Sequence, residues 1–308
     1  MTKNSKPDFK FIDLFAGIGG MRIAFQKAGG ECVFTSEWDK YSQKTYEANF
    51  GEVPFGDITQ IDERDIPKFD VLSAGFPCQP FSTIGKRQGF SHPTQGTLFH
   101  DVVRIMRHQR NKAFLLENVA GLVSHDNGRT LSVIEETLTE LKYRFDYKVL
   151  DAADFGVPQH RSRIYIVGFR SRKGGRVQLE WPEGNKRPKG IGSAVEKGVT
   201  GHSISKHLQD VYLFKVDDGR PQIIDSSSDV PVKTLVASYH KIQRLTGTFV
   251  RDGETGLRLL TANECKAIMG FPKNFKIPVS RTQMYRQMGN SVAVPVVTEI
   301  AKLIAKEL

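Results

Sequence analysis

Short apolar runs alternate with helix-like stretches along the first 170 residues, and this alternation limits the possible folds more than any other feature. The runs typical of buried strands lie at 10–16, 31–36, 69–74, 113–116, 145–151 and 163–169. Helix-compatible stretches lie at 21–28, 98–110 and 130–142, the last with leucine and isoleucine at three- and four-residue spacing. Strands that alternate with helices predict an α/β domain, with a mostly parallel sheet and helices on both faces.

The pattern changes after residue 170. Residues 171–257 are rich in Gly, Pro, Ser and charged residues and have no helical period, which predicts a small irregular domain with a few strands. Helix returns at 261–269, where Thr261 and Glu264 form a capping-box pattern, and a last helix is expected at 291–306. We therefore expect a discontinuous domain of residues 1–170 and 258–308, with the irregular domain 171–257 inserted between its two parts.

The formal net charge of +10 is concentrated in one segment, since residues 161–190 hold nine Lys or Arg and only two acids. Such a segment suits a polyanion such as nucleic acid, although a basic surface that only keeps the protein soluble explains it equally well. The three cysteines do not suggest a disulfide framework, which favours a reducing cytoplasm. No apolar run of about 18 residues and no signal-peptide core is visible, so neither a membrane span nor secretion is expected.

A glycine-rich turn follows the first expected strand, in the segment Asp13-Leu-Phe-Ala-Gly-Ile-Gly-Gly20. Its glycines allow a ligand to approach the backbone where the chain passes from strand to helix. The segment is not the G-x-G-x-x-G dinucleotide fingerprint, and a plain tight turn is an alternative. Glu37 ends the next strand about 20 residues later, where an acid binds ribose hydroxyls in such folds, and Asp57 follows in a third loop. A solvated acid at a strand end explains either residue alone as well.

Cys78 lies in the segment Gly75-Phe-Pro-Cys-Gln-Pro-Phe-Ser82, directly after the strand expected at 69–74. Prolines near it on both sides predict a stiff, open loop, which is the environment that a nucleophilic thiol needs. A buried structural cysteine is the usual alternative, but this segment reads as a loop and not as a core.

Together these segments resemble the DNA cytosine-C5 methyltransferase family, of the bacterial restriction-modification type. The resemblance covers the chain outside about 171–257. It includes five further segments in the family's order: Glu117-Asn-Val119, Gln159-His-Arg161-Ser-Arg163, Arg258-Leu-Leu-Thr261, Met269-Gly-Phe-Pro272 and Gln287-Met-Gly-Asn-Ser-Val292. Each segment is a modest signal alone, but all of them in order form a specific signature.

The resemblance implies a Rossmann-like sheet that binds the methyl donor S-adenosylmethionine, with S-adenosylhomocysteine as the product and no metal. Glu37 would hold the ribose hydroxyls of the donor, and Trp38 would stack on its adenine. The donor-binding residues that it implies are Phe15, Gly17, Gly19, Glu37, Trp38, Asp57, Ile58, Pro77, Leu98, Asn290 and Ser291.

The resemblance also implies the catalytic residues. Cys78 would add to C6 of cytosine, which makes C5 nucleophilic enough to take the methyl group. Glu117 would protonate or hydrogen-bond N3, for which its carboxyl needs a raised pKa. Arg163 would contact O2 of the base, and Arg161 would help to order Cys78 and Glu117.

Because C5 and C6 are out of reach in a stacked duplex, the cytosine is expected to flip out of double-stranded DNA. Residues 80–97 would form the loop that closes over it, unless they are an ordinary exposed loop, and 171–257 would be the target-recognition domain. The candidates for DNA contacts are Ser82, Lys86, Arg87, Gln159, Thr234, Leu235, His240, Lys241 and Arg244. Such residues contact phosphates more often than bases.

Three other functions remain open. A branch of the same family methylates transfer RNA, but it carries Pro-Pro-Cys where this chain has Phe76-Pro77-Cys78. A DNA-binding regulator without catalysis would not need Cys78, Glu117 and Arg163. A nicotinamide-dependent oxidoreductase would use the glycine turn, but its fingerprint is missing. We therefore expect a monomeric, cytoplasmic, nucleoid-associated bacterial DNA methyltransferase, with a cognate restriction endonuclease as a separate partner if it has one.

Overall fold

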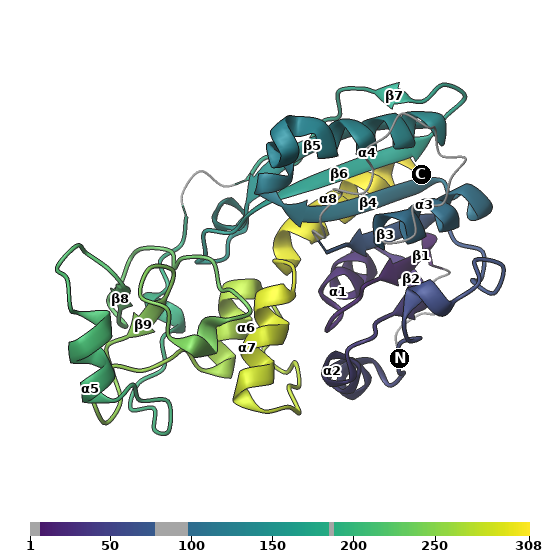
Figure 1. The fold of residues 1–308 in the computed structure, drawn as a ribbon. Coiled ribbons are helices and arrows are strands. Elements are labelled where there is room, and N and C mark those ends of the chain that lie inside the picture. The colour runs from purple at the N-terminus through teal and green to yellow at the C-terminus, as the bar shows by residue number, and fades with distance from the viewer. Residues whose placement is uncertain (1–6, 78–97, 185–187) are drawn as a thin grey trace.

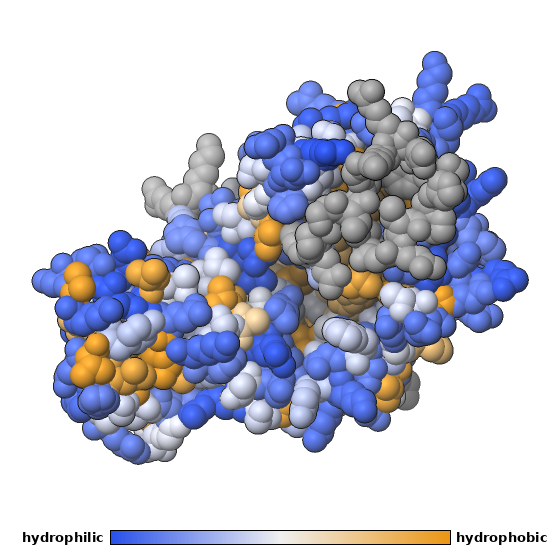
Figure 2. All heavy atoms as spheres, in the orientation of Figure 1, coloured by the Kyte–Doolittle hydropathy of each residue, from blue (hydrophilic) through white to orange (hydrophobic). Residues whose placement is uncertain are grey.

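The structure is a computed structural model that describes residues 7–77, 98–184 and 188–308. Two lobes lie side by side: a larger one that contains the main sheet, and a smaller one that contains β8 (Gln222–Ile224) and β9 (Thr248–Val250) (Figure 1). The space-filling view shows the surface hollowed between them (Figure 2).

The larger lobe is built on a seven-stranded sheet with the order β2-β1-β3-β4-β6-β5-β7. Its strands are β1 (Phe9–Leu14), β2 (Gly30–Ser36), β3 (Val71–Gly75), β4 (Ala113–Val119), β5 (Tyr143–Asp151), β6 (Ser162–Arg170) and β7 (Gly175–Arg176). Neighbours among β1 to β4 are parallel, whereas β6 is antiparallel to both β4 and β5. The sheet is therefore mixed, and the expectation of parallel pairing holds for β1 to β4. The link between β5 and β6 holds only a 3-10 turn (Ala152–Phe155), too little for the crossover that parallel neighbours require.

Helices cover both faces of this sheet, as the sequence predicts (Figure 1). One face carries α1 (Gly20–Lys27) and α8 (Val294–Glu307), and the other carries α3 (Leu98–Gln109) and α4 (Arg129–Glu140). Successive strand residues point to opposite faces, so Phe11 joins the core with α1 and α8 while Ile12 joins the core with α3 and α4. A further helix, α2 (Lys40–Phe50), follows β2.

The smaller lobe consists mainly of loops and short helices. Its α-helices are α5 (Lys206–Leu208), α6 (Ala262–Met269) and α7 (Arg281–Asn290), and β8 pairs parallel with β9. Short turns of other helix types lie in both lobes at Ile58–Gln60, Ala120–Val123, His125–Gly128, Gly192–Ala194, Gln209–Leu213 and Tyr239–Lys241. The capping box expected at Thr261 and Glu264 does begin α6.

Two segments pack across the domain boundaries that the sequence suggests. Beyond residue 170, β7 pairs with β5, and the indole N–H of Trp181 donates to Asp146 at 2.8 Å, so this part stays with the sheet. α6 and α7 lie with the smaller lobe, and only α8 returns to the sheet (Figure 1). The division of the chain at residues 170 and 258 stays a prediction. In the structure, β7 and Trp181 lie with the larger lobe, whereas α6 and α7 lie with the smaller lobe.

Among the described residues, Arg281–Glu307 is long and apolar enough to cross a membrane. In this fold 61% of its apolar window is buried inside the protein, and α8 packs on α1 and the sheet. Burial of this extent is what an apolar core helix requires.

Candidate active site

The glycine-rich turn joins β1 to α1 with a run of left-handed backbone. Phe15, Gly17 and Gly19 have φ values of 57°, 55° and 86°. A Cβ on Gly17 would meet nothing within 4 Å, so space lies open above it, whereas a Cβ on Gly19 would lie 2.3 Å from the Phe50 ring. The two glycines therefore have different roles. Gly17 leaves its backbone open to a ligand, and Gly19 allows α2 to pack closely against the turn.

Glu37 directly follows β2, and its side chain contacts the glycine-rich turn, as the spacing of the two segments predicts. Its Oε2 accepts a hydrogen bond from the Gly17 backbone N–H at 2.8 Å, and its Oε1 accepts one from the Asp39 backbone N–H at 2.7 Å. Burial raises the pKa of this carboxyl, and the two backbone donors oppose that shift. Next to it, Trp38 is 78% exposed, which leaves its indole face free to stack on a planar ligand.

Other predicted donor-binding residues lie on segments that meet this end of the sheet. The Glu37 N–H donates to the Phe55 carbonyl at 2.8 Å, which brings the loop of Asp57 and Ile58 beside β2. Ser291 comes from the far end of the sequence, yet a Cβ on Gly20 would lie 2.9 Å from its Oγ. The remaining three are Asn290, exposed at the end of α7, Pro77, exposed after β3, and Leu98, half-buried at the start of α3.

Glu117 and Arg163 form a nearly buried ion pair on adjacent antiparallel strands. Arg163 Nε lies 3.3 Å from Glu117 Oε1, and the side chains are 15% and 12% exposed. Burial raises the pKa of Glu117, while the charges of Arg163 and Arg161 oppose the shift. The pKa of Glu117 is therefore shifted upward, which is the direction that the expected role of this acid requires.

The chain leading to Cys78 is fixed beside Glu117. Gly75 pairs in register with Glu117, and a Cβ on Gly75 would lie 3.3 Å from Glu117 Oε2. Asn118 donates from Nδ2 to the carbonyl of buried Phe76 at 2.9 Å. Cys78 itself lies outside the described residues, as do Ser82, Lys86, Arg87 and the expected loop 80–97.

Arg161 is buried and donates to three backbone carbonyls. Nη1 reaches the Leu235 carbonyl at 3.1 Å, and Nη2 reaches those of Gly289 and Ser291 at 3.0 and 2.6 Å. These bonds join the predicted recognition domain to the segment that closes the donor side. The expected role of Arg161 in ordering Cys78 and Glu117 stays a prediction.

The candidates for DNA contacts divide into buried and accessible residues. Gln159, Leu235 and Arg244 are buried, and the polar groups of Gln159 and Arg244 bind other parts of the protein. Their geometry favours support of the lobe over direct contact with DNA. Lys241 is exposed, while Thr234 and His240 are half-buried, so these three are accessible to a partner.

Sequence reasoning missed several residues that organise the site. Asp13 is completely buried beneath the glycine turn, Asn118 holds the approach to Cys78, and Gln287 accepts from Thr45 Oγ1 at 3.0 Å. Asn118 and Gln287 stand in the family segments quoted above, so their position there was the available signal. Nothing in the local sequence distinguishes a buried Asp13 from a solvated one.

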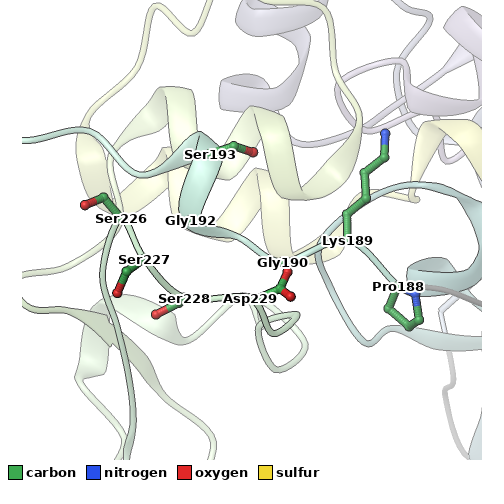
Figure 3. A pocket seen from close by; sticks show the side chains of 9 residues that line it. All are labelled: Pro188, Lys189, Gly190, Gly192, Ser193, Ser226, Ser227, Ser228 and Asp229. Atoms are coloured by element: carbon green, nitrogen blue, oxygen red, sulfur yellow. The ribbon is translucent and has the colours of Figure 1, made fainter.

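A separate hollow of about 480 Å³ lies in the smaller lobe (Figure 3). It is lined by Pro188, Lys189, Gly190, Gly192, Ser193, Ser226, Ser227, Ser228 and Asp229. None of these residues belongs to the glycine-rich turn of residues 15–20, called the donor turn from here on for its expected ligand, or to the Glu117–Arg163 pair. In the described parts of the chain no three His, Cys, Asp or Glu side chains gather as a metal site would need.

A family model described as C-5 cytosine-specific DNA methylase matches residues 9–306. The chain is 60% identical over 301 residues to the Type II methyltransferase M.MspI of a Moraxella species. This alignment covers 98% of the chain and 71% of that protein. It is 58% identical to the Type II methyltransferase M.BsuFI of Bacillus subtilis, over 97% of this chain and 73% of the relative. The crystal structure of the S. pombe Dnmt2 methyltransferase matches with a TM-score of 0.78 at 21% identity, over 97% and 99% of the two chains. At that identity the likeness concerns the fold.

Proposed function

The chain belongs to the C-5 cytosine-specific DNA methylase family and is a DNA (cytosine-5-)-methyltransferase, and we propose that it acts through a covalent bond between Cys78 and C6 of a flipped-out cytosine. The observation that carries this proposal is the nearly buried Glu117–Arg163 pair, with Nε and Oε1 3.3 Å apart. It provides a proton donor and a fixed cation beside the strand end that leads to Cys78.

Covalent addition solves a chemical problem of the substrate, because C5 of an aromatic cytosine is a poor nucleophile. The Cys78 thiolate attacks C6, a C–S bond forms, and the electron pair of the C5–C6 double bond moves through the ring toward N3. C5 then carries the electron density needed to take a methyl group. A base removes the C5 proton, the C–S bond breaks, the thiolate leaves with its electron pair, and the proton on N3 returns to Glu117.

Glu117 supplies the proton that this addition needs. Negative charge grows on N3 during attack, and a neutral carboxyl can donate to it. Burial raises the pKa of Glu117, which favours the protonated carboxyl, while the charges of Arg163 and Arg161 oppose that shift. Arg163 lies 3.3 Å from Glu117 and donates from Nη1 to the Ser162 carbonyl at 2.8 Å, and we propose that one of its other N–H groups contacts the O2 atom of the base.

Family and fold imply S-adenosylmethionine as the methyl donor. The residues at the donor turn fit that molecule: open space lies above Gly17, a carboxylate is fixed at Glu37, and a bare indole stands at Trp38. When bound there, the donor would supply an electrophilic methyl group. Glu37 would hold its ribose hydroxyls, and Ser291, 2.9 Å from the site of a Cβ on Gly20, would close the pocket.

The substrate is double-stranded DNA, from which the target cytosine must rotate to reach Cys78. We place the duplex in the recess between the lobes, where the accessible residues Thr234, His240 and Lys241 of the smaller lobe would contact it. The relatives at 60% and 58% identity are both named as Type II methyltransferases. We therefore propose a monomeric, cytoplasmic enzyme of a restriction-modification system, with its endonuclease as a separate protein.

The first experiment is methyl transfer from tritiated S-adenosylmethionine to unmethylated duplex DNA or to transfer RNA. We expect label on DNA with the wild type and none with Cys78→Ala, and bisulfite mapping of the product then gives the target sequence. Cys265→Ala is the matched control, because Cys265 is a buried thiol in α6. Label on RNA alone would overturn the DNA assignment.

A second experiment tests the covalent step itself. In the presence of S-adenosylmethionine, DNA with 5-fluorocytosine at the mapped target should trap the methylated adduct, because fluorine cannot leave C5 as a proton does. We expect a denaturant-resistant protein–DNA band with the wild type and with Cys265→Ala, and none with Cys78→Ala. A wild type that methylates DNA yet forms no such band would refute the covalent mechanism.

A further inference from the structure

Arg161 lies where three segments that are distant in the sequence meet. It stands directly before β6, its side chain is 3% exposed, and its two Nη atoms bind the carbonyls of Leu235, Gly289 and Ser291. Leu235 belongs to the predicted recognition domain, while Gly289 and Ser291 lie at the junction of α7 and α8. One guanidinium therefore holds both segments at once.

On the recognition side, residues 159 to 161 hold the Thr234–Leu235 segment at three points. The Leu235 N–H donates to Gln159 Oε1 at 2.7 Å, and the Thr234 hydroxyl donates to the His160 carbonyl at 2.6 Å. Arg161 completes the set at the Leu235 carbonyl. This segment cannot shift relative to β6 without breaking these hydrogen bonds, of which the two at Leu235 are buried and the one at Thr234 is exposed.

On the donor side, residues 287 to 291 touch both helices next to the glycine turn. Gln287 Oε1 accepts from Thr45 in α2 at 3.0 Å, and Ser291 Oγ lies 2.9 Å from where a Cβ on Gly20 of α1 would be. The same segment presses on the recognition side, since a Cβ on Gly289 would lie 2.3 Å from the Ala237 nitrogen. A shift of residues 287 to 291 would therefore change contacts at both the glycine-rich turn and the recognition segment.

The chemistry of Arg161 makes this junction sensitive to position. Burial lowers the pKa of its guanidinium to about 10, so the side chain remains charged at neutral pH. Among the described residues its Nε has no partner, and its Nη atoms donate to three carbonyls, whose oxygens stabilise the charge. A planar fork can satisfy all three only while the two segments keep one relative placement.

We propose that Arg161 is a positioning residue that couples the donor pocket to the recognition segment, so that donor and DNA each tighten the binding of the other. The identity of the two ligands rests on the proposed function. The coupling is reciprocal by thermodynamic necessity, and couplings of this kind typically change an affinity by about 5- to 150-fold.

The test measures the dissociation constant of S-adenosylhomocysteine, which cannot react, with and without saturating DNA. A long, unmethylated, PCR-amplified DNA serves as the probe, because it contains any short target many times. We expect a ratio of roughly 5 or more in the wild type, and a ratio within about twofold of 1 in Arg161→Lys, whose single ammonium cannot span three carbonyls. Gly289→Ala should lower the ratio as well, because its methyl group pushes Val236 and Ala237 away while Arg161 is intact.

Arg258→Lys is the matched control. Arg258 is as deeply buried, but its partners are Glu196, Asp252, Leu259 and Glu264, none of which lies between residues 287 and 291. Arg258→Lys should keep the wild-type ratio even if its melting temperature falls. A wild-type ratio near 1, or a wild-type ratio retained in folded Arg161→Lys, would overturn the coupling role. If Arg161→Lys does not fold, an unchanged ratio in Gly289→Ala overturns it instead. Failure of the proposed function differs from all of these, since the wild type would then transfer no methyl group to DNA.

Discussion

Replacement of Asp13 by asparagine should remove a large pH-dependent contribution to stability. Asp13 is fully buried at the end of β1, and burial raises its pKa from 3.8 to about 7, although the Ser73 hydroxyl and Arg22 favour the charged form. Ser73 Oγ donates to Asp13 Oδ1 at 3.1 Å, but Oδ2 has no hydrogen-bond partner within the described part of the chain. The carboxylate is therefore poorly compensated once it ionises in the folded protein.

The sign and size of the effect follow from the two pKa values. Between pH 3.8 and about 7 the folded state keeps the proton that the unfolded state has lost, so the free energy of unfolding falls as pH rises. The difference between the two pKa values corresponds to about 4 kcal/mol. Asparagine cannot titrate, so Asp13→Asn should lack this loss. Glu37 and Glu117 are present in both proteins and cancel in the comparison.

The assay is urea unfolding of both proteins at intervals from pH 4 to pH 8. We expect the stability of Asp13→Asn relative to the wild type to rise across that interval by about 4 kcal/mol. An Asp65→Asn variant, at an exposed site, controls for the loss of one carboxylate. Parallel stability curves for the wild type and Asp13→Asn would refute the reasoning, because they would mean that Asp13 is already ionised at low pH.

Three further predictions concern the site. Glu117→Gln should lower the rate of methyl transfer by about 10²- to 10⁴-fold. In a pH profile of kcat/KM, the wild type should lose activity as rising pH deprotonates Glu117, and the variant should not. If the variant shows the same decline, another group causes the decline. Trp38→Ala should weaken S-adenosylhomocysteine binding by about 1–3 kcal/mol in calorimetry and leave the melting temperature unchanged, because the indole is 78% exposed; equal donor affinity would rule out stacking. Gly19→Ala should destabilise the fold by about 1–3 kcal/mol in urea unfolding, since φ is 86° and the Phe50 ring lies 2.3 Å from the new Cβ; an unchanged midpoint would show that α2 moves freely.

The sequence predicts the buried strands best, because each is a short apolar run between turns. β1, β2, β3 and β6 lie within about two residues of the expected ranges. α2 and α7 are absent from the prediction because their sequences, KYSQKTYEANF and RTQMYRQMGN, are mostly polar and show little helical period. Their caps carried the signal instead: Asp39 accepts from the Ser42 N–H, and Ser280 accepts from the Gln283 N–H.

Much of the site follows from spacing, and the rest depends on contacts that leave no local trace. Spacing from the glycine turn predicts Glu37, and the structure brings the two together through the bond to Gly17. The partners of Arg161 are backbone carbonyls, which every residue has, so no pattern of side chains could indicate them. The close approach of α7 to the smaller lobe at Gly289 likewise involves backbone, since a Cβ there would lie 2.3 Å from the Ala237 nitrogen.

The pairing of α1 with α8 has a consequence for protein synthesis. α1 and the donor turn leave the ribosome before α8 and Ser291, because they lie more than 250 residues earlier in the sequence. Until α8 emerges, the apolar side of α1 lacks its cover and the Gly20 side of the donor turn lacks its neighbour Ser291. A nascent or prematurely terminated chain that stops short of α8 would therefore be inactive. Translation of α8 must therefore be complete before a newly made chain can become active.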